Sequence, residues 1–248
     1  MHVNPAPKER LIKKAPVALL QNILFLDIET VAQHASFEEL DPTGQRLFEK
    51  KTAYQRRDGI SASEFYERAG IWAEFGKVVC ISVAFLQNLD GRPGFVSKSF
   101  FGHDEKYILQ QFKRLLQRSF DKKNHVLCAH NGKEFDFPYL ARRMLINRIS
   151  LPEILDLFGK KPWEVRHLDT MEMWRFGDFK QYTSLELLAY VFGIPSPKNE
   201  LEGSAVNRQY HEKGDLRAIV AYCERDVMAV VRLYLSLRAR EEKLAVPI

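Results

Sequence analysis

Two acids interrupt an apolar stretch near the start of the sequence, which reads NILFLDIETV from Asn22 to Val31. The apolar and partly β-branched residues of this stretch favour a buried strand over a short helix. Side chains alternate faces along a strand, so we expect Asp27 and Glu29 to project side by side. Neighbouring carboxylates in an apolar setting repel each other and lose hydration. Either a bound cation relieves this repulsion, or the acids end a strand and bond to backbone amides, Arg or Lys.

Two further segments carry acids in positions of interest. AHNGKEFDFPYL crosses from a strand to a helix, with Asn131 at the strand end and Asp136 where the helix begins. In YCERDVMAVVRLYL, Tyr222 and Asp226 are four residues apart and share one helix face. Each segment alone has an ordinary explanation, namely an N-cap Asp with an Asn turn, and a hydrogen-bonded surface pair.

Taken together, the three segments offer four carboxylates: Asp27, Glu29, Asp136 and Asp226. Hard oxygen ligands of this kind suit Mg²⁺ or Mn²⁺. The sequence contains no H-E-x-x-H, G-x-S-x-G, P-loop or G-x-G pattern, so the common zinc-protease, serine-hydrolase and nucleotide-cofactor signatures are absent. A metal-dependent reaction without a nucleotide cofactor is the chemistry that the residues favour.

Composition sets wider bounds. The chain has 248 residues, 46% of them hydrophobic, which is enough for one sizeable core. Its formal net charge is +5, and this basic surface is compatible with a polyanionic partner, although many other proteins share it. Three widely spaced cysteines in apolar stretches (Cys80, Cys128 and Cys223) are typical of buried free thiols in a reducing compartment. Residues 1–18 are a basic lead-in without a signal-peptide core or membrane span, so we expect a cytoplasmic protein with no membrane contact.

The pattern along the chain predicts strands interleaved with helices. We expect strands at 22–30, 78–86, 95–102 and 125–131 with a further candidate at 164–171, and helices at 104–120, 137–148, 184–192 and 217–240. A charged, helix-compatible insertion occupies about 34–76, and its role is open. Three strands in meander order followed by alternating elements predict a mixed-sheet α/β fold in a single domain, residues 19–242.

The motifs FLDIET, HNGKEFD and YCERD, in that order, resemble the three motifs of the DEDD 3'-to-5' exonucleases, which have a ribonuclease H-like fold. Tyr222, four residues before Asp226, is similar to the marker of the tyrosine subclass. The segments SLELLAYVFGIPSPK and EGSAVNRQYHEKGDLRAIVAYCERDV resemble stand-alone proteins related to the exonuclease domain of family B DNA polymerases. The resemblance covers residues 23–238, with Glu202 standing where that narrower family is expected to favour Asp.

This resemblance implies a metal-dependent 3'-to-5' exonuclease that releases nucleoside 5'-monophosphates, with single-stranded DNA as the expected substrate. It implies two divalent ions, Mg²⁺ or Mn²⁺, with Asp27 bridging them. Glu29 and Asp226 would complete the site of the attacking water, and Asp136 would act on the second ion. Tyr222 would orient the water, because a phenol with a pKa near 10 is a poor base at neutral pH.

Substrate contacts follow from the same resemblance. Glu29 and the Thr30 backbone would hold the terminal 3'-hydroxyl, Asn131 would contact a phosphate, and Phe135 would wedge or stack near the terminal bases. Core packing is the alternative for Phe135 and for Phe137. Candidates for a phosphate track are Lys133, Arg142, Arg143, Lys180 and Tyr182. Open alternatives are an exonuclease acting on RNA, an endonuclease of the same fold, a nucleic-acid-binding module without turnover, and a structural protein whose acids form salt bridges.

Overall fold

One mixed sheet organises the chain in this computed structural model, which describes residues 17–57, 59–90, 92–178, 180, 182–195 and 203–238. The strand order is β3-β2-β1-β4-β5. The strands are β1 (Ile23–Ala32), β2 (Gly76–Leu89), β3 (Arg92–Phe101), β4 (Val126–Ala129) and β5 (Leu168–Asp169). The pairs β1/β2 and β2/β3 are antiparallel, whereas β1/β4 and β4/β5 are parallel. The predicted meander opening and the α/β fold are confirmed.

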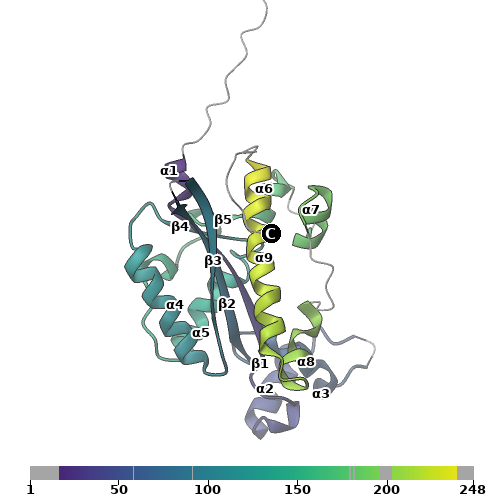
Figure 1. The fold of residues 1–248 in the computed structure, drawn as a ribbon. Helices are drawn as coiled ribbons and strands as arrows, with labels where there is room; N and C mark the ends of the chain where they lie inside the picture. Colours follow the sequence, from purple (N-terminus) through teal and green to yellow (C-terminus); the bar gives the residue numbers. More distant parts are fainter. Residues whose placement is uncertain are drawn as a thin grey trace, which may run out of the picture.

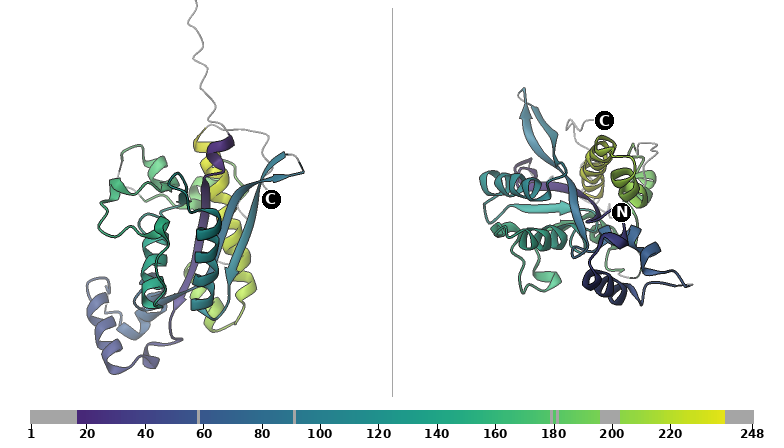
Figure 2. Two further views of the ribbon diagram at one scale, coloured as in Figure 1. Left: turned by 90° about the vertical axis from the view of Figure 1, so that its left-hand side faces the viewer. Right: turned by 90° about the horizontal axis from the view of Figure 1, so that it is seen from below.

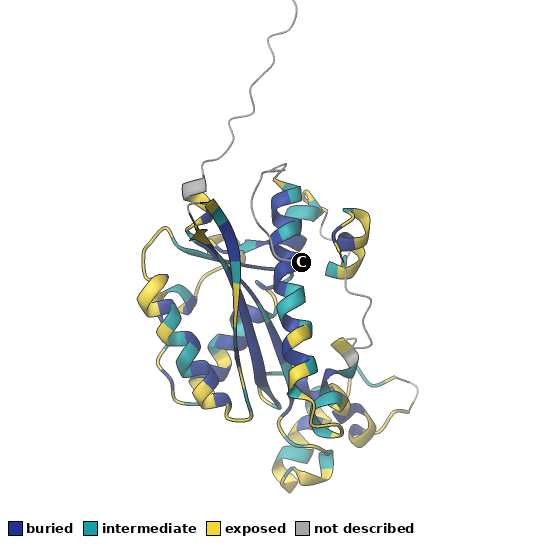
Figure 3. Ribbon diagram, viewed as in Figure 1, coloured by how far each residue is buried: buried dark blue, intermediate teal, exposed yellow. Residues whose placement is uncertain are grey.

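The central strand β1 is buried on both faces, and its alternation determines where the acids point. Leu24, Leu26 and Ile28 pack in a core with α4 (Glu105–Ser119) and α5 (Asp136–Ile146). Ile23 and Phe25 pack on the other face, against α9 (Leu216–Leu237). Figures 1 and 2 show α9 on one side of the sheet and α4 with α5 on the other, and Figure 3 shows the buried strands between them. The positions of Asp27 and Glu29 therefore fall on the α9 face.

A bulge interrupts the β1/β2 ladder beside these acids. Glu29 pairs with Cys80 but Thr30 pairs with Val78, so Val79 is the extra residue on β2. As a result, Val79 and Cys80 both pack toward α9. Bulges sharpen the local twist of a sheet and are common next to functional sites.

The helix α9 runs for 22 residues along the sheet. Its N-cap Asp215 accepts a hydrogen bond from the Ala218 backbone at 3.0 Å. Buried residues at helical spacing, among them Ile219, Cys223 and Val227, face the sheet. This agrees with the helix expected at 217–240, although residues 239–240 lie outside the described chain.

The insertion between β1 and β2 is helical, as predicted. It holds η1 (Phe37–Glu39), α2 (Pro42–Thr52), α3 (Ala62–Phe65) and η2 (Tyr66–Ile71). These elements share a small core around Phe48 and Tyr66, whose ring centroids are 5.0 Å apart. Figure 1 places α2 and α3 beyond the C-terminal end of β1.

The strand expected at 164–171 is largely wrong. Only Leu168 and Asp169 form a strand, and α6 (Thr170–Arg175) begins immediately afterwards. The cause is the Asp169 side chain, which caps the helix by accepting from the backbone N–H of Met171 at 2.9 Å and of Glu172 at 3.3 Å.

Several short elements complete the fold. The helix expected at 184–192 is confirmed as α7 (Leu185–Val191), whereas α6 and α8 (Val206–His211) were not predicted. The remaining short elements are α1 (Val17–Leu20), η3 (Glu153–Leu155), η4 (Pro162–Glu164) and η5 (Gly203–Ala205). Within the described ranges, no helix combines the length and apolar content needed to cross a membrane. Residues 1–16 of the predicted lead-in lie outside the described residues. Glu202 and residue 242, which is the expected end of the domain, also lie outside them.

Candidate active site

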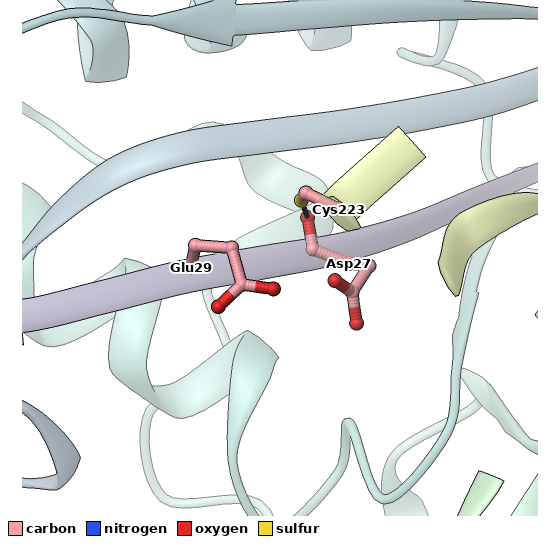
Figure 4. Close-up of side chains that lie close together, drawn as sticks. All are labelled: Asp27, Glu29 and Cys223. Carbon is pink, nitrogen blue, oxygen red and sulfur yellow. Dashed lines mark hydrogen bonds between the residues drawn. The ribbon is translucent and has the colours of Figure 1, made fainter. Parts of the chain in front are cut away.

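Asp27 and Glu29 form the centre of an acidic cluster against α9. One carboxylate oxygen of each acid and the Cys223 sulfur all lie within 4.8 Å of one another. Both carboxylates point to the same side of β1 in Figure 4, as the alternation along the strand predicts. The Cys223 thiol donates a hydrogen bond to the Asp27 carbonyl at 3.4 Å, which ties α9 to the strand at this level.

The structure brings Asp136 and Asp226 to the same cluster. Burial raises the pKa of Asp27 well above its ordinary value, and the charges of Glu29, Asp226 and Asp136 raise it further. Burial likewise raises the pKa of Glu29, with further contributions from Asp226, Cys80 and Asp136. Four carboxylates from β1, α5 and α9 thus influence one another, although they are far apart in the sequence.

Burial also raises the pKa values of the other two acids, Asp136 and Asp226. Burial raises the pKa of Asp136 to about 7, against a lowering by the backbone N–H groups of Asp136 and Ile28. Burial also raises the pKa of Asp226 to about 6, although the Tyr222 hydroxyl and Arg225 lower it. Both shifts favour the protonated acid in the absence of a counter-charge.

The neighbours of these acids decide between the two explanations of the pair in β1. Among the described residues, no Lys or Arg forms an ion pair with Asp27, Glu29 or Asp136. The salt-bridge explanation therefore lacks its partner. Clustered carboxylate oxygens that repel each other fit a divalent cation of the Mg²⁺ or Mn²⁺ type.

Tyr222 lies on α9 one turn before Asp226, so the two side chains share one face of the helix. Burial raises the pKa of Tyr222 above its ordinary value, and the charges of Asp226, Glu29 and Asp27 raise it further. The phenol therefore stays protonated at neutral pH and keeps a hydrogen to donate. The start of η5 approaches the same hydroxyl, since a Cβ on Gly203 would lie 3.8 Å from it.

The loop from β4 to α5 depends on a residue that sequence reasoning missed, Asp169. Its buried carboxylate accepts from the backbone N–H of Asn131 at 3.0 Å and of Lys133 at 3.1 Å. Asn131 is left-handed, with φ 61°, and a Cβ on Gly132 would collide with the Ala129 side chain. The available signal was the acid in HLDTM, directly before a helix-compatible segment.

The predicted substrate residues lie around this loop. The Asn131 Oδ1 atom is buried and has no hydrogen-bond partner among the described residues. His130 contacts Thr170 Oγ1 at 2.9 Å and the Thr183 carbonyl at 2.8 Å, which attaches the end of β4 to the segment before α7. That segment carries Lys180 and Tyr182, both exposed. Thr30 is partly buried on β1. The roles of these residues stay predictions.

Other predicted contacts fare differently. The assignment of Arg143 to a phosphate track is wrong, because its buried guanidinium binds the Glu105 carboxylate at 2.5 and 2.8 Å. Lys133 is already paired with Glu172 at 2.6 Å. Phe135 is partly buried against the core, which favours the packing alternative, and its ring lies 5.2 Å from that of Tyr139. Phe137 is fully buried, whereas Arg142 is exposed.

Comparison with known proteins agrees with this fold. Among solved structures, the family B DNA polymerase from the hyperthermophilic archaeon Pyrobaculum calidifontis is similar, with a TM-score of 0.55 and 15% sequence identity. The match covers 87% of this chain but only 24% of the polymerase, and at this identity it shows the fold alone. No curated protein matches the sequence. Residues 71–246 match the family described as "predicted 3'-5' exonuclease related to the exonuclease domain of PolB". Because this match spans most of the sequence, the chain belongs to that family of exonucleases related to PolB.

Proposed function

We propose that the protein hydrolyses phosphodiesters from the 3' end of a nucleic acid, with single-stranded DNA as the first substrate, and releases nucleoside 5'-monophosphates. The observation that carries this proposal is the cluster of four carboxylates with no Lys or Arg ion pair to Asp27, Glu29 or Asp136 among the described residues. The family match supports the 3'-to-5' direction.

The four acids would hold two divalent ions, Mg²⁺ or Mn²⁺: Asp27, Glu29, Asp136 and Asp226. Bound ions of this kind lower the pKa of a water and stabilise the departing oxygen of the phosphodiester. The carboxylates must be ionised to bind them, and their raised pKa values make proton release part of metal binding.

Tyr222 would orient the attacking water. Its O–H could donate to Asp226 one turn later, and the lone pairs of the phenol oxygen could accept a hydrogen bond from that water. A protonated phenol of raised pKa is a positioning group and takes no proton from the water.

The substrate end would be bound by polar groups next to the acids. Glu29 and the Thr30 backbone would hold the 3'-hydroxyl, and the carboxamide of Asn131, buried without a partner for its Oδ1, would contact the terminal nucleotide. Buried polar atoms are normally hydrogen-bonded, and substrate would supply the missing partner. Lys180 and Tyr182, exposed before α7, would follow the next phosphates.

The three described cysteines support a cytoplasmic location. All are buried and free. Free thiols of this kind are usual in reducing compartments.

The test uses a 5'-labelled single-stranded DNA with Mg²⁺, with Mn²⁺ and with EDTA, compared with Asp27→Asn and Asp226→Asn proteins. A matched control is Glu49→Gln, an exposed acid on α2. A metal-dependent ladder that shortens from the 3' end, present in the control and lost in both site variants, supports the proposal. Wild-type turnover by folded Asp27→Asn protein would contradict it. A circular single strand separates an exonuclease from an endonuclease, and a labelled RNA of the same sequence tests the substrate class.

A further inference from the structure

Two large aromatic side chains stand out into solvent on the segment that leads to β5. Phe158 is 91% exposed and Trp163 is 78% exposed. The Lys161 ammonium lies 5.3 Å from the centroid of the Trp163 ring, a cation–π distance. Exposed aromatic rings of this kind offer faces on which nucleobases can stack.

A cavity of about 240 Å³ opens beside this segment. Four cations line it, Lys122, Lys123, Lys160 and Arg166, against two acids, Asp121 and Glu153. None of these four cations forms an ion pair within the part of the chain that the structure describes. Unpaired cations that converge on a hollow create a positive potential there.

The inner wall of this cavity is rigid and neutral. The Leu127 backbone donates to His167 Nδ1 at 3.2 Å, and His167 Nε2 donates to the Ile154 carbonyl at 2.9 Å. This tautomer leaves the ring without charge, and burial together with Lys160 lowers its pKa to about 4. The positive charge of the cavity therefore comes from its rim, where a polyanion can reach it.

The cavity is separate from the acidic cluster. His125, which lines it, directly precedes β4, whereas Asp136 follows the other end of that strand. The cavity also opens on the α4 side of the sheet, as its residue Phe120 shows, while Asp27 and Glu29 lie toward α9. A ligand here would leave the acids accessible.

We propose that this region is a second binding surface for single-stranded nucleic acid, which holds the strand at nucleotides remote from the 3' end being hydrolysed. The residues of this basic-aromatic surface are Lys122, Lys123, Phe158, Lys160, Lys161, Trp163 and Arg166. Its cations contact phosphates, and Trp163 and Phe158 stack on bases, which is the combination that single-strand binding requires. The inference rests on the proposed function only for the class of ligand.

The test measures binding without turnover. Fluorescence anisotropy in EDTA compares a long oligonucleotide of about 20 nucleotides with a short one of about four, because only the long one reaches both sites. The charge variant is Lys160→Gln with Arg166→Gln, and its matched control is Lys50→Gln with Lys106→Gln, two exposed cations on α2 and α4. The stacking variant is Trp163→Ala. All of these side chains are exposed, so the fold is retained, and circular dichroism checks this.

We expect the charge variant to bind the long oligonucleotide at least tenfold more weakly. The slope of the logarithm of its binding constant against the logarithm of salt concentration should become shallower by about 1.4, because two phosphate contacts are lost. Trp163→Ala should bind the long oligonucleotide about fivefold more weakly or worse, which is the effect expected for the loss of one stacked base. The variants should lower the affinity for the long oligonucleotide by a larger factor than the affinity for the short one, and the control pair should bind both as the wild type does. In the turnover assay, KM for the long substrate should rise while kcat stays the same.

Unchanged affinity and salt slope in the charge and stacking variants would overturn the inference, even if the protein hydrolyses DNA. Weaker binding of the long oligonucleotide would uphold it, even if the wild type hydrolyses nothing, so the two proposals fail separately. Polyglutamate is the further probe. If the variants lose affinity for polyglutamate but keep it for the oligonucleotide, the surface serves an acidic protein and the inference is wrong.

Discussion

Replacing Asp136 by Asn should stabilise the metal-free protein at neutral and alkaline pH. The folded-state pKa of Asp136 is raised to about 7 from an ordinary value of 3.8. The folded protein thus holds this proton more tightly than the unfolded chain, and the resulting stability, fully present below pH 3.8, is lost as pH rises to about 7. At about 1.36 kcal/mol per pKa unit, full ionisation costs at most about 4 kcal/mol. Because coupled carboxylates share the charge of the cluster, we expect about 2 kcal/mol.

The Asn side chain keeps an oxygen acceptor for the backbone N–H groups near Asp136 but carries no charge. In EDTA, the melting temperature of Asp136→Asn should exceed that of the wild type by about 4–8 °C at pH 8, for a chain of this length. The difference should shrink toward zero near pH 4–5. Added Mn²⁺ should raise the melting temperature of the wild type more than that of the variant. A variant whose melting temperature is below that of the wild type at pH 8 would refute the reasoning. So would a difference in melting temperature that is the same at every pH.

Three further predictions concern residues that support the site. The pKa of His167 is lowered to about 4, so the neutral ring stabilises the folded protein above pH 6.5, and up to about 3 kcal/mol of this stability is lost as pH falls toward 4. In urea unfolding, His167→Asn should lack this pH-dependent loss. The Asp169 carboxylate accepts from backbone N–H groups, and Asp169→Asn would turn an amide donor toward one of them. The substitution should lower the free energy of unfolding by about 2 kcal/mol and reduce turnover. Turnover equal to that of the wild type would contradict a positioning role for Asp169. Glu105→Gln leaves the buried Arg143 charge unpaired and should cost about 3–5 kcal/mol in chemical denaturation, whereas a loss below about 1 kcal/mol would show that the pair is not needed.

The parts of the fold that were predictable are those with a clear period. β1 alternates between two buried faces, so the common direction of Asp27 and Glu29 follows from their spacing. The helical period of α9 likewise puts Tyr222 and Asp226 together. Both patterns are local, and the carboxylates that follow them are the ones that the structure brings into one cluster.

The parts that were not predictable depend on long-range partners. Arg143 looks like a surface cation in sequence, but its guanidinium meets Glu105 from α4 and donates to the Ala73 carbonyl at 2.7 Å, at the end of the insertion. Asp169 looks like part of a strand, but its carboxylate closes a loop 38 residues earlier in the chain. Pairing of this kind has no short-range signal, because the sequence does not report which distant backbone groups need an acceptor.

These supporting contacts explain how the chain tolerates the acidic cluster. Burying Asp27 and Glu29 together destabilises the metal-free fold, since burial and mutual repulsion both oppose their ionisation. The Glu105 carboxylate, with Arg143, the Val78 backbone at 2.7 Å and Asn147 at 2.8 Å, locks the opposite face of the same sheet. A rigid frame keeps the carboxylates from relaxing apart, so their repulsion is retained as affinity for a cation. Loosening that frame, as Glu105→Gln would, should therefore weaken Mn²⁺ binding although Glu105 itself lies on the far side of the sheet, and isothermal titration of folded variant protein measures this.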